Sequence, residues 1–188
     1  MSTTHTALEM SLGDFEGAWA VASMGAGTSG SVAVDAAGMT DTGVINSLHA
    51  IQQHMRTANI ARIALAGQIA ERSRASLGEA GMARKAGYGR AALMVAAICS
   101  ITPAEAFRLC EVGLATRTRT AIDGTPLPAR YPVVAAAISG GTLGVDSAAV
   151  IVKELDAAST RCSVEAREAG EAVLMEMAGQ YSVEGTCD

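Results

Sequence analysis

The stretch that decides the fold is residues 99–120, CSITPAEAFRLCEVGLATRTRT. Thr102 suits the N-cap of a helix, Pro103 suits its first turn, and Glu105 stands where a capping box places its acidic residue. Apolar side chains then recur every three to four residues, the spacing of one helix face, until Thr116. The stretch therefore predicts a capped amphipathic helix. The side chains expected to pack in it are Ala106, Leu109, Cys110 and Leu114.

Helices separated by short breaks are predicted on both sides of this stretch. A helix over 90–99 precedes it, and the Pro/Gly-rich IDGTPLPARYP follows it as a loop. Further helices are expected over 133–139, from Asp146 onward, and from Ser163 onward, and no segment shows sustained strand alternation. The sequence predicts an all-α multi-helix bundle. The pairs at 90–115 and 133–155 resemble helix–turn–helix units, in which the second helix lies in the DNA major groove, but ordinary packing explains them too.

One long helix is predicted over residues 44–74. At ~1.5 Å per residue it would span ~45 Å, more than a compact domain of this size needs. Such a helix lies along the whole bundle or pairs with a second copy, and we expect a homodimer through 44–74. Its apolar positions, spaced alternately four and three apart at first, are Val44, Leu48, Ile51, Met55, Ala58, Leu65 and Ile69.

Three regions follow from this pattern: an N-terminal segment with a flexible Gly/Ser-rich linker (1–43), a helical domain (44–184) and a short tail (185–188). The linker, placed at 23–43, contains Gly25, Gly27 and Gly30 in a GxGxxG spacing. A dinucleotide site needs a strand before such glycines and a helix after them, within a βαβ unit. Neither neighbour is predicted here, so we expect no bound cofactor.

The formal net charge of −5 conceals three blocks of different sign. Residues 1–55 hold five acidic and no Lys or Arg side chains, residues 56–130 hold eleven basic and five acidic, and residues 131–188 hold three basic and nine acidic. A basic middle indicates an anionic partner such as double-stranded DNA, or else merely solvated helix faces. The predicted phosphate contacts are Arg90, Arg108, Arg117 and Arg119.

Several classes of function are not indicated. No basic region followed by an apolar run marks a secretory signal, and no apolar run is long enough to cross a bilayer. The four cysteines form no CxxC pair, which indicates reduced thiols in a cytoplasmic protein. His49 and His54 are five residues apart and cannot chelate one metal ion from a helix. We therefore predict neither a catalytic site nor a metal site.

Three successive pieces resemble one known pattern: GYGRAALMVAAICSITPAEAFRLCEVG, GTPLPARYPVVAAAISGGTLGVDSAAVIVKEL and SVEAREAGEAVLMEMA. They resemble the helical N-terminal region of the actinobacterial thirteen-E-twelve repeat family, a domain of unknown function commonly followed by an HNH endonuclease module. The resemblance covers about residues 44–184. It departs at Ser147 and Gly144, where the family often has His and Ser.

The resemblance implies an HNH-associated domain without its nuclease, because no His or Asn follows Leu155. The chain looks like the front half of such a protein. We therefore expect a non-catalytic helical domain that binds DNA or positions a nuclease. The alternative is a structural module that mediates oligomerisation or another protein–protein interaction.

Overall fold

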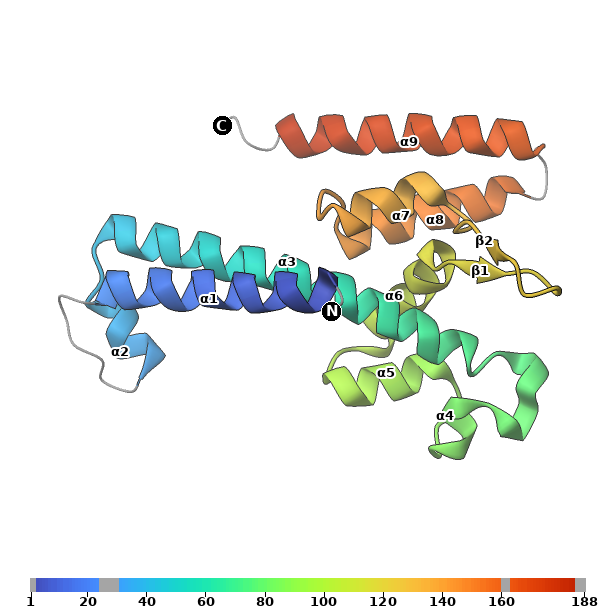
Figure 1. The fold of residues 1–188 in the computed structure, drawn as a ribbon, viewed down its shortest axis with the longest axis horizontal. Coiled ribbons are helices and arrows are strands. Elements are labelled where there is room, and N and C mark those ends of the chain that lie inside the picture. The colour runs from blue at the N-terminus through green and yellow to red at the C-terminus, as the bar shows by residue number, and fades with distance from the viewer. Residues whose placement is uncertain (1–2, 24–30, 160–162, 185–188) are drawn as a thin grey trace. The chain divides into compact units, whose positions relative to one another are not determined.

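The computed structural model describes residues 3–23, 31–159 and 163–184, and the fold is all-α, as predicted (Figure 1). A single two-stranded sheet of two residues per strand occurs in the described part. The elements in chain order are α1 (Thr3–Ser23), α2 (Val32–Ala37), α3 (Asp41–Glu71), the 3₁₀ helix η1 (Ala75–Ala80), α4 (Met82–Lys85), α5 (Ala91–Cys99), α6 (Pro103–Thr116), β1 (Arg119–Thr120), β2 (Pro126–Leu127), α7 (Pro132–Ser139), α8 (Val145–Ser159) and α9 (Val164–Glu184).

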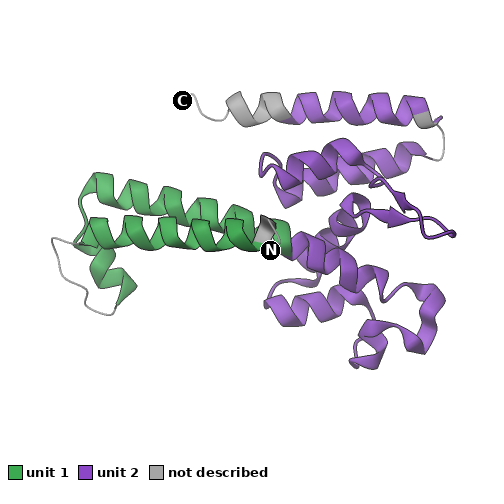
Figure 2. Cartoon of the chain, in the orientation of Figure 1, with its two compact units in different colours: residues 1–61 green, residues 62–188 purple. Residues whose placement is uncertain are grey.

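The chain forms two compact units, residues 1–61 and residues 62–188 (Figure 2). The long helix predicted over 44–74 is confirmed as α3, which begins and ends three residues earlier and contributes to both units. The domain boundary placed after residue 43 from composition stays a prediction.

Unit 1 is a helical hairpin in which α1 packs antiparallel to the first part of α3. The Ser11 hydroxyl lies 3.1 Å from His54 Nδ1, and a Cβ built on Gly43 would lie 3.2 Å from the Ala22 Cβ. Residue numbers rise along α1 as those of their α3 neighbours fall, which defines the antiparallel register.

The prediction of a flexible linker over 23–43 is wrong for residues 32–37, which form α2. These residues read VAVDAA and contain neither Gly nor Ser, so the composition of the surrounding stretch concealed a helix-compatible run. The segment before the linker forms α1, a helix of 21 residues. The GxGxxG glycines lie outside the described residues.

The core of unit 2 surrounds α6, which packs against α5, α7 and α8. The predicted N-cap is present: Thr102 Oγ1 accepts a hydrogen bond from the Glu105 N–H at 3.2 Å, and Pro103 is in the first turn. Burial of Ala106, Leu109 and Cys110 is confirmed, and Leu114 is partly buried. The core is built from small and branched aliphatic side chains, as the low aromatic content implied.

The closest approach in unit 2 is between the C-terminal half of α3 and α6. A Cβ built on Gly113 would lie 2.4 Å from the Ile63 carbonyl oxygen and 2.6 Å from the Gly67 nitrogen. A Cβ on Gly67 would lie 2.5 Å from the Gly113 carbonyl carbon. Two glycines therefore let the helix backbones touch at this crossing.

The predicted Pro/Gly loop, residues 122–132, contains β2, which pairs antiparallel with β1 just before the loop. Asp123 and Gly124 form its turn, with Gly124 at φ +87° and the Thr125 N–H donating to Asp123 Oδ1 at 2.9 Å. The hydrogen bonds from Thr125 hold the pKa of the Asp123 carboxyl below its usual value. Two-residue strands carry no alternation that a sequence pattern could reveal.

Among the described residues, no single helix is long and apolar enough to cross a bilayer. Only α5 and α6 together reach that length and composition, and they are bent by 115° relative to each other.

Candidate functional site

Two of the four predicted phosphate contacts are engaged in ion pairs within unit 2. Arg108 Nε lies 2.9 Å from Asp146 Oδ1, and Arg117 Nη2 lies 2.8 Å from Glu71 Oε2. Arg108 is thus paired with α8, whereas Arg117, which follows the end of α6, is paired with the last residue of α3. The structure does not bring them together.

The other two predicted contacts are exposed and differ in their surroundings. Arg119 Nε donates a hydrogen bond to the Pro128 carbonyl at 3.0 Å, which fixes it on the β1–β2 pair. Arg90 stands at the N-cap position of α5 and has no ion-pair partner among the residues that the structure describes.

The α5–α6 pair has helix–turn–helix proportions without an arginine-rich recognition face. The helices are bent by 115° and joined by three residues, of which Ser100 adopts a left-handed conformation with φ 55°. However, α6 is largely buried in the core, and its exposed side carries Ala104 and Phe107. Packing is therefore the role of α6 that the structure supports.

A different group of cations lies along the segment from the end of α3 to the start of α5. We call Arg72, Arg84, Lys85 and Arg90 the basic surface. All four are exposed, and none has an ion-pair partner within the described residues. Arg72 and Lys85 line the same open cavity of about 550 Å³.

The backbone of this region is held by bonds to the end of α3. The Met82 N–H donates to the Arg72 carbonyl at 2.8 Å, and the Ala83 N–H donates to the Ser73 hydroxyl at 3.0 Å. These bonds dock α4 onto the two residues that follow α3, so the cations of α4 are presented from a fixed support.

Only Arg90 of the basic surface was predicted from the sequence. Residues 71–89 are rich in turn-forming residues, and in the sequence their cations appear only as part of the positive charge of residues 56–130. The available signal was local: residues 72–90 hold five basic side chains and one acidic side chain.

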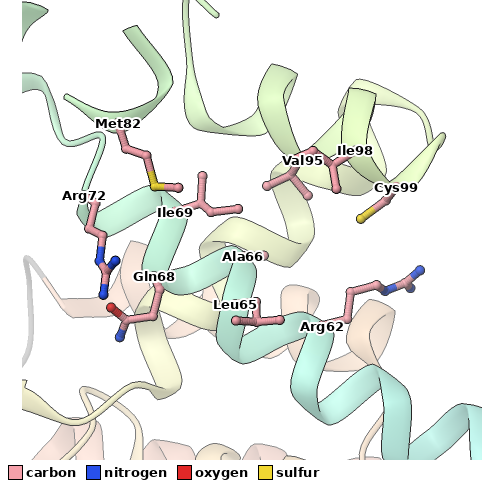
Figure 3. A pocket seen from close by; sticks show the side chains of 10 residues that line it. All are labelled: Arg62, Leu65, Ala66, Gln68, Ile69, Arg72, Met82, Val95, Ile98 and Cys99. Carbon is pink, nitrogen blue, oxygen red and sulfur yellow. The ribbon is translucent and has the colours of Figure 1, made fainter. Parts of the chain in front are cut away.

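An apolar groove lies beside the basic surface, between α3 and α5, with a volume of about 350 Å³. Figure 3 shows Arg62 and Arg72 toward its two ends and apolar side chains between them. Ile98, 61% exposed, and Cys99 form part of its wall.

The nearby Cys110 is buried, and burial together with the Glu111 charge raises the pKa of its thiol to about 11. That thiol is therefore protonated and unreactive at neutral pH.

A cluster of polar side chains surrounds the start of α7. The Tyr131 hydroxyl donates a hydrogen bond to Asp156 Oδ1, and Arg130 Nη2 lies 2.7 Å from the same oxygen. The Arg130 guanidinium also lies 5.3 Å from the centre of the Tyr131 ring. Burial and the Asp156 charge raise the pKa of the neighbouring Glu111 carboxyl, against a lowering effect of Arg130.

A buried carboxylate caps α7 from another helix. Tyr131, at the N-cap position, does not cap the helix with its side chain, whereas Glu171 of α9 accepts a hydrogen bond from the Val134 N–H at 2.9 Å. Glu171 is 2% exposed. A negative charge at a helix N-terminus is favourable, because the first backbone N–H groups there have no partner within the helix. The PLPARYP stretch that carries the family resemblance therefore ties the start of α7 to α8 through Tyr131 and Arg130, and Glu171 ties α7 to α9.

The Tyr131 cluster predicts a specific sensitivity to high pH. Burial and the Asp156 hydrogen bond raise the pKa of the Tyr131 hydroxyl from 10 to about 12. Because the folded pKa is raised, this tyrosine's contribution to stability is fully present below about pH 10 and is lost as pH rises towards about pH 12. Chemical denaturation across this range should show a stability loss in the wild type that is smaller in Tyr131→Phe. Equal losses in both proteins would contradict the assignment.

In the part of the chain that the structure describes, no group of three or more His, Cys, Asp or Glu side chains could hold a metal ion. His54 contacts Ser11 in unit 1.

The sequence matches the family described as "Domain of unknown function (DUF222)" over residues 49–185. No curated protein and no solved structure matches the chain significantly. The matched region includes the groove, the basic surface and the buried cap of α7, and it covers most of the chain. The chain belongs to the DUF222 family of domains of unknown function.

Proposed function

We propose that unit 2 binds double-stranded DNA through the basic surface. The observation that carries the proposal is that Arg72, Arg84, Lys85 and Arg90 are exposed and have no ion-pair partner among the described residues. Unpaired cations release condensed counterions from DNA phosphates when they bind, which supplies sequence-independent affinity.

The contrast with the other arginines supports this choice of surface. The charges of Arg108 and Arg117 are already compensated by Asp146 and Glu71, so phosphate would have to compete with a carboxylate at each position. Arg90 retains the role predicted from the sequence. Arg108, Arg117 and Arg119 stay predictions and are expected to contribute less.

A nuclease-positioning role, implied by the family resemblance, would use the same surface. Phosphate contacts fix the orientation of a domain on a duplex without reading its sequence. A nuclease acting beside such a domain would thereby be held near the DNA backbone, and unit 2 itself would remain non-catalytic.

Binding of a duplex labelled with a fluorophore should depend steeply on salt. With four phosphate contacts, the association constant is expected to fall about 100-fold between 50 and 200 mM salt. Fluorescence anisotropy titrations at several salt concentrations measure this slope. Binding that is absent at 50 mM salt, or that does not change with salt, would contradict the proposal.

A matched pair of charge reversals locates the surface. Lys85→Glu changes a cation of the basic surface, whereas Lys153→Glu makes the same change on the exposed side of α8, where Lys153 also has no ion-pair partner among the described residues. We expect Lys85→Glu to weaken binding about tenfold on all sequences alike and to reduce the salt slope by about one. Lys153→Glu should leave both nearly unchanged, and equal effects of the two variants would place the interface elsewhere.

A further inference from the structure

The first part of α3 turns small side chains toward α1. Gly43 lies against Ala22 and His54 against Ser11, and Ser47 between them is 4% exposed. We call this side of α3 the inner seam. Its members, spaced four, three and four residues apart, are Gly43, Ser47, Ala50 and His54.

The large apolar side chains of the same helix face solvent. We call Val44, Leu48, Ile51 and Met55 the outer stripe; each member follows a seam residue by one position and so lies ~100° around the helix. Val44 is 44% exposed, Leu48 63% and Met55 47%. Residues 42–55 contain no Asp, Glu, Lys or Arg.

Within its described residues, unit 1 has no buried apolar core against which the outer stripe could pack. Its buried residues, within the described part of the chain, are Ser23, Asp35 and Ser47. On α1, the residues that follow the positions facing α3 by one include Leu12, which is 43% exposed, and Trp19. These two side chains lie on the same side of the antiparallel hairpin as the outer stripe. The same offset also places Glu16 on this face between Leu12 and Trp19, so the exposed apolar side chains of the face come mainly from α3.

The outer stripe is self-complementary in the antiparallel direction. Its spacing of four, three and four reads the same from either end, so a second copy running the opposite way sets Val44 opposite Met55 and Leu48 opposite Ile51. The flanking charges also match. Asp41 of one chain comes within two residues, ~3 Å along the helix axis, of the position opposite Arg56 of the other. Neither charge has an ion-pair partner among the described residues.

We propose that the apolar face of unit 1 pairs with the same face of a second copy, with the two α3 helices antiparallel, to form a four-helix bundle. In such a bundle, the directions from one helix to its two neighbours are roughly 90° apart. The ~100° between the inner seam and the outer stripe matches this arrangement. A two-fold interface brings the same patch of both chains together, and the α3 part of this patch, residues 42–55, carries no Asp, Glu, Lys or Arg to repel its copy. A contact along the whole hairpin, ~30 Å long for the 21 residues of α1 and two helices, ~20 Å, wide, would have a footprint of ~600 Å², against ~800 Å² per partner in stable interfaces; the outer stripe itself spans ~17 Å of that length.

The mass of the full chain in solution tests the proposal. Sedimentation equilibrium should give twice the chain mass of 19.1 kDa at micromolar concentration. Leu48→Glu should raise the dissociation constant at least about tenfold, because it places two charges in an apolar interface. Asn46→Glu adds the same charge on an exposed position away from the stripe and should leave the dimer intact. Circular dichroism checks that both variants remain helical.

A charge exchange tests the antiparallel pairing and distinguishes a second copy from another partner. Arg56→Asp alone sets two pairs of like charges together and should weaken the dimer at least about threefold. Adding Asp41→Arg to the same chain should restore wild-type affinity, since both charges then exchange across the two-fold axis. A wild-type chain that is monomeric at all concentrations, a Leu48→Glu chain that remains dimeric, or a double variant as weak as Arg56→Asp would each overturn the proposal. DNA binding by unit 2 is a separate measurement, so either proposal can fail alone.

Discussion

Gly113→Ala should destabilise unit 2 by about 3 kcal/mol and lower its Tm by roughly 10 °C. The added methyl group would meet the Ile63 carbonyl oxygen at 2.4 Å and the Gly67 backbone at 2.6 and 2.7 Å. These are main-chain atoms of a helix, which cannot rotate away as the end of a flexible side chain can. The helices α3 and α6 must therefore separate, which opens the packed core around Ile63 and Val112.

Gly170→Ala provides the control for this prediction. A Cβ at Gly170, on α9, would meet only the Leu155 Cδ2 atom at 4.0 Å, an ordinary contact. Alanine favours a helix over glycine by about 1 kcal/mol, so this variant should be neutral or more stable. Thermal and urea unfolding measure both variants. A Gly113→Ala protein as stable as Gly170→Ala would show that the two helices do not cross as described.

Glu171→Ala should cost about 3 kcal/mol. The substitution removes the carboxylate that accepts from the buried Val134 N–H, leaving that donor unsatisfied at the start of α7. It also leaves space where a 2%-exposed side chain stood. Because Tyr131 provides no side-chain cap, α7 has no substitute acceptor at this position among the described residues. Urea unfolding measures the loss, and faster amide exchange at Val134 assigns it to the cap.

Two variants separate this cap from a general effect of changing α9. Glu171→Gln keeps an acceptor oxygen but removes the charge, and should cost about 1 kcal/mol. Glu168→Ala removes an exposed carboxylate one turn earlier on the same helix and should have little effect. If Glu171→Ala and Glu168→Ala are equally stable, Glu171 does not cap α7.

The sequence predicted those parts of the fold that depend on neighbours in the chain. The cap at Thr102 and the burial of Leu109 follow from residues within one or two helical turns, and both are present. The ends of α7 follow from Pro132 and from the glycines at 140 and 141. The two-residue strands escaped prediction because they contain no period.

The contacts that fix the packing join residues far apart in the sequence. Gly67 and Gly113 read as helix-weakening residues until their backbones are seen to touch. Glu171 lies among many acidic residues of α9, and nothing local marks it as the buried one. The outer stripe was recognised from its spacing, but spacing alone did not reveal that Leu48 is exposed while Ser47 is buried.

The candidate site was only partly predictable for the same reason. Charge counting identified a basic middle region, but the charge of an arginine is available to a ligand only where no carboxylate compensates it. Arg117 and Arg108 are paired with acids from α3 and just after the start of α8, elements that lie far from them in the sequence. Arg72 and Lys85 come together because α4 docks on the end of α3 through the Met82 N–H.

The most direct test of the DNA-binding proposal is a titration of ¹⁵N-labelled protein with a short duplex, followed by amide chemical shifts. The proposal predicts that the largest shift changes fall on the backbone of residues 72–90 and decrease when salt is added. Residues of α8 around Lys153 should change little. Changes centred on α8 or α9, or no change at low salt, would contradict the assignment of the basic surface as the nucleic-acid interface.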